Sequence, residues 1–120
     1  MTVRSNTPKR GELYLIDLNP VVGNEMRDTH RCVVISPREV NVLGMCLTVV
    51  VTTGGQFARR AGLAVNITGH ETNGVALCNH VRSFDILSRV KQKTARHIDT
   101  LDSDTVDEIV AKVVGIIEAN

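Results

Sequence analysis

Residues 9–20 read Lys9-Arg10-Gly11-Glu12-Leu13-Tyr14-Leu15-Ile16-Asp17-Leu18-Asn19-Pro20, and residues 32–36 read Cys32-Val33-Val34-Ile35-Ser36. Each stretch holds a short apolar run typical of a β-strand, predicted over residues 13–18 and 32–36. The segment between the two runs is crowded with polar and ionisable side chains. A hydrophobic core has no use for so many such groups, whereas a site for an anionic ligand does. The pattern therefore predicts a strand, a functional polar loop and a second strand.

Further strands follow along the chain. The run at residues 45–52 is β-branched and almost continuously apolar, which predicts a central strand buried on both faces. Residues 63–67 and 75–78 are predicted strands, and residues 81–84 either continue the last of these or pair with it. Residues 91–97 are too polar to assign.

The C-terminal segment has the periodicity of an amphipathic helix. Asp102 or Ser103 can cap it, and acidic residues gather near its start. The order of elements predicts a mainly β protein, a small, strongly curved antiparallel barrel with this helix packed on it. We expect a flexible arm at residues 1–9 and a single domain at residues 10–120. The apolar stripe consists of Val106, Ile109, Val110, Val113, Val114 and Ile117.

Composition limits the class of protein. The chain has 120 residues, no Trp and three other aromatic side chains, so its core must be aliphatic. Residues 27–97 carry ten Lys and Arg against four acids, and residues 98–120 carry one against six, which predicts a basic surface on the body of the domain.

Three cysteines lie in apolar runs without metal-ligand spacing, so we expect buried thiols and no zinc. With neither a secretory signal nor a membrane-length apolar run, the sequence predicts a cytoplasmic protein.

Four segments together resemble the MazF/PemK family of toxins, and the PemK and ChpB branches most of all. The resemblance implies an SH3-like barrel of the CcdB/MazF type with a C-terminal helix, a homodimer, and sequence-selective cleavage of single-stranded RNA. It also implies a cognate antitoxin as partner. The segments are Arg10-Gly11-Glu12 with Asp17-Leu18-Asn19-Pro20; Gly23-Asn24-Glu25; Val51-Thr52-Thr53-Gly54-Gly55-Gln56-Phe57-Ala58-Arg59; and residues 74–85, Gly74-Val75-Ala76-Leu77-Cys78-Asn79-His80-Val81-Arg82-Ser83-Phe84-Asp85.

RNA can be cleaved without a metal or cofactor when its own 2′-OH attacks the adjacent phosphate. The site then needs a base, an acid and a donor to the phosphorane. Glu25 matches a catalytic family position and is the expected base, although composition alone favours an ion pair with Arg27 or Arg31. Thr52 matches a family threonine that hydrogen-bonds the phosphate, although most strand threonines bond only to the backbone.

The family normally has Arg-Pro before the second strand, and that arginine stabilises the phosphate or acts as the acid. An ungapped alignment places His30 at the arginine and Arg31 at the proline. Imidazole can donate a proton near neutral pH, whereas guanidinium makes a permanent bidentate clamp. We favour Arg31 for the phosphate and keep His30 as the alternative; most loop histidines have no catalytic role.

Some PemK relatives use an Arg, an Asp and a His for catalysis, and here Leu77, Asn79 and Asn24 occupy those places. Asn79 can read a base edge or hold a phosphate, but it cannot act as a base. Its neighbour His80 is either an RNA contact or a histidine at a strand end.

The remaining candidates are expected RNA contacts. Phe57 can stack on a base or belong to the core, and the cations are either RNA contacts or ordinary surface charge. The leading function is an endoribonuclease toxin. A relative that binds RNA or antitoxin without cleavage is the alternative, and a gyrase inhibitor like CcdB is disfavoured because the chain has no Trp. The expected contacts are Asn24, Gln56, Phe57, Arg59, Arg60, Asn79, His80, Arg82, Arg89 and Lys91.

Overall fold

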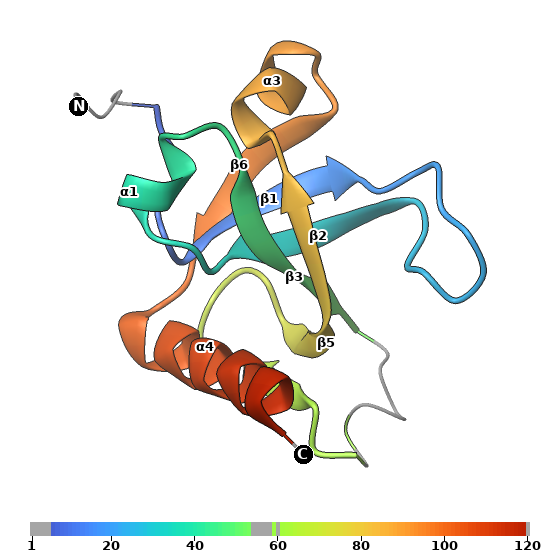
Figure 1. Ribbon diagram of the computed structural model, residues 1–120, viewed down its shortest axis with the longest axis vertical. Helices are drawn as coiled ribbons and strands as arrows, with labels where there is room; N and C mark the ends of the chain where they lie inside the picture. The colour runs from blue at the N-terminus through green and yellow to red at the C-terminus, as the bar shows by residue number, and fades with distance from the viewer. Residues whose placement is uncertain (1–5, 54–58, 60, 120) are drawn as a thin grey trace.

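The computed structural model describes residues 6–53, 59 and 61–119, and its strands form one six-stranded antiparallel sheet (Figure 1). The strands run side by side in the order β4-β5-β3-β2-β1-β6. This architecture confirms the predicted antiparallel β fold with a C-terminal helix. The strands are β1 (Glu12–Asp17), β2 (Thr29–Val34), β3 (Cys46–Thr52), β4 (Ala64–Ile67), β5 (Gly74–Phe84) and β6 (Ala95–Thr100); the helices are α1 (Arg38–Asn41), α3 (Ile86–Lys91) and α4 (Ser103–Glu118).

Several elements differ from the sequence prediction. β2 begins at Thr29, three residues before the predicted start, and the two predicted runs at residues 75–78 and 81–84 are one strand, β5. Helices α1 and α3 were not predicted, because four and six residues are too few to show a helical period. The polar segment 91–97 contains the end of α3 and the start of β6, an edge strand with a single buried side chain, Ala95.

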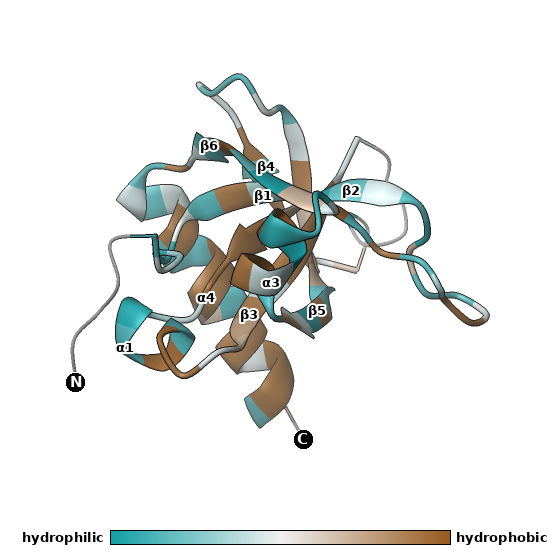
Figure 2. Cartoon of the chain, turned by 90° about the horizontal axis from the view of Figure 1, so that it is seen from above, coloured by the Kyte–Doolittle hydropathy of each residue, from teal (hydrophilic) through white to brown (hydrophobic). Residues whose placement is uncertain are grey.

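The sheet has an apolar cluster on each face. On one face, Leu13, Val33 and Val49 pack with Val106 and Ile109 of α4. On the other face, residues such as Ile16, Cys32 and Val50 pack with Ile86 of α3. Alternation of side chains along each strand therefore supplies both clusters, with α4 covering one face and α3 the other (Figure 1). Figure 2 shows the hydrophobic residues of α4 and β3 in brown near the middle of the molecule.

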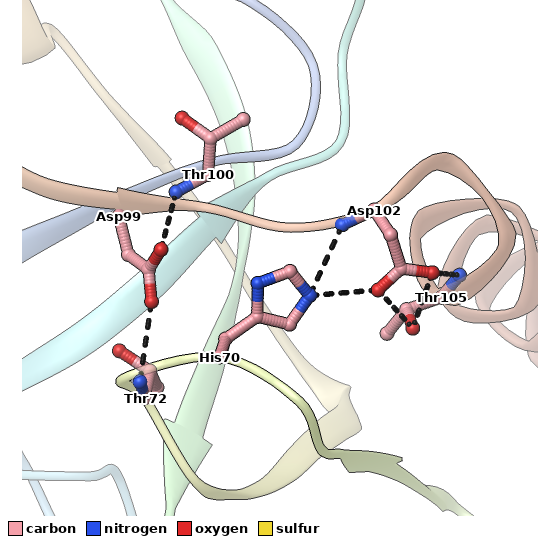
Figure 3. A network of polar contacts seen from close by, with 6 residues as sticks. All are labelled: His70, Thr72, Asp99, Thr100, Asp102 and Thr105. Carbon is pink, nitrogen blue, oxygen red and sulfur yellow. Dashed lines mark hydrogen bonds and ion pairs between the residues drawn. The ribbon is translucent and has the colours of Figure 1, made fainter.

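Helix α4 starts at a network that joins it to the β4–β5 turn (Figure 3). Asp102 is the N-cap and accepts the Thr105 N–H at 3.0 Å, which confirms one of the two predicted caps. His70 Nε2 lies 2.7 Å from Asp102 Oδ1 and donates to it, because a carboxylate only accepts. Asp99 Oδ2 accepts the Thr72 N–H at 3.1 Å.

The start of the described chain is packed against the domain. Thr7 and Pro8, which belong to the predicted arm, are buried, and the Pro8 carbonyl accepts a hydrogen bond from buried Asn41 at 2.9 Å. Residues 1–5 lie outside the described residues. The predicted buried thiols are confirmed, since Cys32, Cys46 and Cys78 are all buried and free. Among the described helices, none is long and apolar enough to cross a membrane.

Candidate functional site

The pairing of β2 with β3 decides which candidate side chains share a face of the sheet. Cys32 of β2 lies opposite Val50 of β3, so their side chains point to the same side. Side chains alternate along a strand, so His30 and Thr52, each two residues farther along, point to that side as well. Arg31 points to the opposite side. The structure therefore places His30, and not Arg31, on the face that carries Thr52.

Arg31 belongs to a different surface. Leu15 of β1 pairs with Arg31 on one side and with Arg96 of β6 on the other, so the three side chains form a row across the strands. Both arginines are exposed. The role of Arg31 at the phosphate stays a prediction, and the structure adds that Arg31 and Thr52 point to opposite faces of the sheet.

The β1–β2 loop, residues 18–28, projects from the sheet in both views (Figure 1 and Figure 2). Asn24 and Glu25 are exposed in it. Glu25 Oε1 accepts the Val22 N–H at 2.8 Å, and the Glu25 N–H donates to the Val22 carbonyl at 3.2 Å. Within the described residues Glu25 forms no ion pair with Arg27 or Arg31, so its carboxylate is held by its own turn.

The two ends of this loop are tied together. Asn19 Nδ2 donates to Asp28 Oδ1 at 3.1 Å, and the Asp28 N–H donates to Asn19 Oδ1 at the same distance. Leu18 N–H donates to the Asp28 carbonyl at 2.9 Å. Asp28 adopts a φ of 68°, a conformation that Asp and Asn tolerate better than most residues. No hydropathy pattern marks Asp28, so its role at the loop root is visible only in the structure.

A bulge in β5 presents the next two candidates. The pairing partner in β5 jumps from Leu77 to Val81 between two adjacent residues of β3, so Cys78, Asn79 and His80 oppose no residue of that strand. Asn79 is exposed and His80 is half-buried. Bulges redirect side chains and are common beside active sites. Asn79 is therefore available to a ligand, as its predicted role requires.

Thr52 is held in place by a close backbone approach. It pairs with Val75 at the start of β5, and a Cβ added to the preceding residue, Gly74, would lie 2.5 Å from the Thr52 carbonyl oxygen. Gly74 also has a φ of 139°. Only glycine fits there without displacing the end of β3.

Leu77 stands at the position where the family resemblance implies an arginine in some PemK relatives. It is 3% exposed and packs with Val75, Leu63 and Met26. An apolar side chain in this setting supplies no charge to the site. Its contact with Met26, however, anchors the β1–β2 loop against β5.

Of the remaining predicted RNA contacts, Lys91 is exposed and Arg89 is half-buried. Arg59 is exposed and lies 3.4 Å from the Asn66 side-chain oxygen. Arg82 is half-buried and donates to the Leu18 carbonyl at 3.3 Å, so its guanidinium is engaged within the protein. Gln56, Phe57 and Arg60 lie outside the described residues.

Burial and nearby cations have opposite effects on the pKa of a thiol next to this site. Burial raises the pKa of the Cys32 thiol to about 12, although the Arg82 and Arg89 guanidinium groups act in the opposite direction. Cys32 therefore stays protonated and serves as a core residue. In the described part of the chain, no cluster of three or more His, Cys, Asp or Glu side chains is arranged to hold a metal ion.

Comparison with known proteins agrees with this arrangement. Residues 9–117 match the model of a family described as the PemK-like, MazF-like toxin of type II toxin–antitoxin systems. Endoribonuclease PemK of Escherichia coli is 32% identical over 88% of this chain and 82% of its own. Endoribonuclease toxin ChpB of Escherichia coli strain K12 is 32% identical over 97% of this chain and 99% of its own.

A solved structure also matches. The crystal structure of MazF from Deinococcus radiodurans aligns with a TM-score of 0.78 and 26% identity, covering 92% of this chain and 96% of that one. The family model covers most of the chain, and both relatives exceed 30% identity. The chain therefore belongs to the PemK-like, MazF-like toxin family of type II toxin–antitoxin systems.

Proposed function

We propose that this protein is an endoribonuclease toxin that cleaves single-stranded RNA and is neutralised by a cognate antitoxin. The names of the two relatives and the description of the family support this activity. The observation that carries the proposal onto this chain is the common face of His30 and Thr52 beside the loop that bears Glu25. Buried free thiols support action in the reducing cytoplasm.

The proposed reaction uses the nucleophile already present in RNA. Glu25 takes the proton of the 2′-OH, whose oxygen attacks the adjacent phosphorus, and the 5′-oxygen leaves with a proton. The products are a 2′,3′-cyclic phosphate and a 5′-OH. Thr52 donates a hydrogen bond to the phosphorane oxygens, and His30 supplies the positive charge or the departing proton. The face that His30 shares with Thr52 supports His30 over Arg31 in this role.

The chemistry needs a carboxylate oxygen of Glu25 that is available to the 2′-OH. One carboxylate oxygen of Glu25 accepts the Val22 N–H, which leaves the second oxygen for the 2′-OH. An exposed carboxylate on a projecting loop can meet a single strand without opening of the core. We therefore assign Asn24, Asn79 and His80 to contacts with nucleotides beside the scissile phosphate.

The test is cleavage of a mixed RNA pool by the purified protein in excess EDTA, with mapping of the new 5′ ends. We expect cleavage at a short recurring motif, with 5′-OH ends. A strict metal requirement contradicts the 2′-OH mechanism, and the absence of any cleavage contradicts the proposed endoribonuclease activity.

Leu77 favours a second candidate, a relative that binds RNA or antitoxin without cleavage. Its buried, apolar side chain stands where some PemK relatives have an arginine. The same RNA experiment separates the two candidates, because a binding-only protein retains RNA on a filter but leaves its 5′ ends unchanged.

We propose that the protein assembles as a homodimer through the apolar surface, which we define as Pro37, Val40, Met45, Leu47, Val114 and Ile117. These side chains line one hollow between α1, β3 and α4. Met45 is 51% exposed and Ile117 is 74% exposed. A contiguous exposed apolar patch of this kind marks an interaction site.

A further inference from the structure

Two arginines from the C-terminal half of the chain hold the root of the β1–β2 loop. Arg89 of α3 donates from Nη1 to the carbonyl oxygen of Asp17 at 2.9 Å. Arg82 of β5 donates from Nη1 to the carbonyl oxygen of Leu18 at 3.3 Å. The two carbonyls are consecutive, at the last residue of β1 and the first residue of the loop. Together the arginines fix the point at which the loop leaves the sheet.

Phe84 supports both guanidinium groups. Its buried ring lies 5.0 Å from the guanidinium carbon of Arg82 and 4.7 Å from that of Arg89. Cations at these distances are attracted to an aromatic face. Neither arginine forms an ion pair with a carboxylate among the described residues. Their charged donors therefore serve backbone oxygens rather than an acidic partner.

Further hydrogen bonds extend this support across the loop root. The Asp17 N–H donates to the Thr94 carbonyl at 3.2 Å, and the Thr94 N–H donates to the Arg89 carbonyl at 2.9 Å. The Leu18 N–H donates to the Asp28 carbonyl at 2.9 Å. Asp28 stands two residues before His30, so a shift of the root is passed directly to the start of β2.

We propose that Arg82 and Arg89, stacked against Phe84, are positioning residues that set where the β1–β2 loop leaves and re-enters the sheet. They thereby hold Glu25 and His30 relative to Thr52. The catalytic consequence rests on the proposed function, whereas the effect on the loop does not. The proposal gives Arg82 and Arg89 a role distinct from the RNA contacts that the sequence suggests.

Kinetics separate positioning from RNA contact. Removal of an arginine that binds phosphate lowers the affinity for RNA, so KM rises and the salt dependence of RNA binding weakens. A positioning arginine acts on the assembled complex, so its removal lowers kcat with KM little changed. For Arg89→Ala we expect a loss of kcat of about tenfold or more at unchanged KM. Arg89→Lys should restore part of it, because lysine keeps one charged donor but not the planar stacking group.

The charge-loss control is Lys112→Ala on α4, at the other face of the sheet, and we expect kcat to stay at the wild-type value. The same kinetic measurements apply to Arg82→Ala. A higher KM with unchanged kcat in the Arg82 and Arg89 variants overturns the positioning role, as does full activity. If Arg89→Ala does not fold, Arg89→Lys carries the comparison.

Amide hydrogen exchange tests the loop without any substrate. The amides of Asp17, Leu18 and Asp28 should exchange faster in Arg89→Ala, while the Ile35 amide, bonded to the Leu47 carbonyl at 2.9 Å, serves as an internal reference. Unchanged exchange at all three amides overturns the proposal. If the wild type does not cleave RNA, the proposed function fails, and exchange alone decides the role of the arginines.

Discussion

The Glu25 carboxylate has two possible contributions, since it accepts the Val22 N–H and also stands at the exposed edge of the candidate site. Two substitutions separate them. Glu25→Gln keeps an acceptor for the Val22 N–H but removes the base, whereas Glu25→Ala removes both.

We expect both Glu25 variants to slow RNA cleavage by about tenfold or more, or about 1.4 kcal/mol of barrier. The measurement is single-turnover cleavage of one substrate that carries the mapped motif. Wild-type rates in Glu25→Gln with a loss only in Glu25→Ala would show that the carboxylate is structural.

His30 and Arg31 make the sharpest contrast between neighbouring residues. His30 shares a face with Thr52, and Arg31 does not. We therefore expect His30→Ala to slow cleavage by about tenfold or more and Arg31→Ala to slow it less. His30→Arg places the guanidinium that the family resemblance implies at this position, and it should keep most of the activity.

The readout for this pair is again the single-turnover rate, with RNA affinity measured separately at two salt concentrations. A larger rate loss for Arg31→Ala than for His30→Ala would show that the phosphate is bound on the other face of the sheet. If Arg31→Ala weakens only the affinity for RNA, Arg31 would instead bind RNA from the exposed row that it forms with Arg96.

The contrast between His30 and Arg31 also shows what sequence could predict at the residue scale. Glu25, Thr52 and Asn79 could be named from motif positions. The face of the sheet to which His30 points could not be predicted, because a slip of one residue in the pairing of Cys32 with Val50 would exchange the two faces. That register is set by packing on both sides of the sheet, and no local pattern records it.

At the scale of elements, strands with buried faces were predictable and short polar elements were not. Apolar runs marked β1, β3 and β4 because those strands bury their side chains. β6 is an edge strand with a single buried side chain, so it carries no such signal. The bulge in β5 was hidden for a different reason: it appears only when β5 is paired with β3.

The N-terminus of α4 gives a prediction on pH. The hydrogen bond from His70, together with those from Thr105, holds the pKa of the Asp102 carboxyl well below its usual range. A folded-state pKa that is depressed means that the unfolded chain binds more protons near pH 4, so stability rises with pH there. The contribution is therefore present above about pH 4 and is lost as pH falls below it.

Asp102→Asn keeps a good N-cap and removes only the charge. We expect it to lower the urea midpoint of unfolding at neutral pH, and we expect the difference from the wild type to shrink as pH falls toward about 2. A difference that is the same at both pH values would show that the charge adds nothing beyond the cap.

At the scale of the whole molecule, the proposed catalytic site and the proposed dimer surface lie on different faces of the sheet. α3 and the β1–β2 loop lie on the side of His30 and Thr52, and α4 covers the other side. We therefore expect substitutions on one face to alter the proposed catalysis and substitutions on the other face to alter the proposed assembly. This separation makes the apolar surface testable without disturbing the loop.

Ile117→Glu is the test of the homodimer. Its side chain is 74% exposed in the single chain, so the substitution should leave the fold intact while placing a charge in the apolar surface. We expect the wild type to sediment at twice the 13.1 kDa of one chain, and the variant to require a concentration about tenfold higher or more to associate. Val90→Glu is the matched control, since Val90 is 40% exposed on α3 and lies outside the apolar surface. A buried charge weakens association only where the two copies meet, because it loses its contact with water there. An interface at this surface would be contradicted by a wild type that stays monomeric. It would also be contradicted if both substitutions weakened association equally.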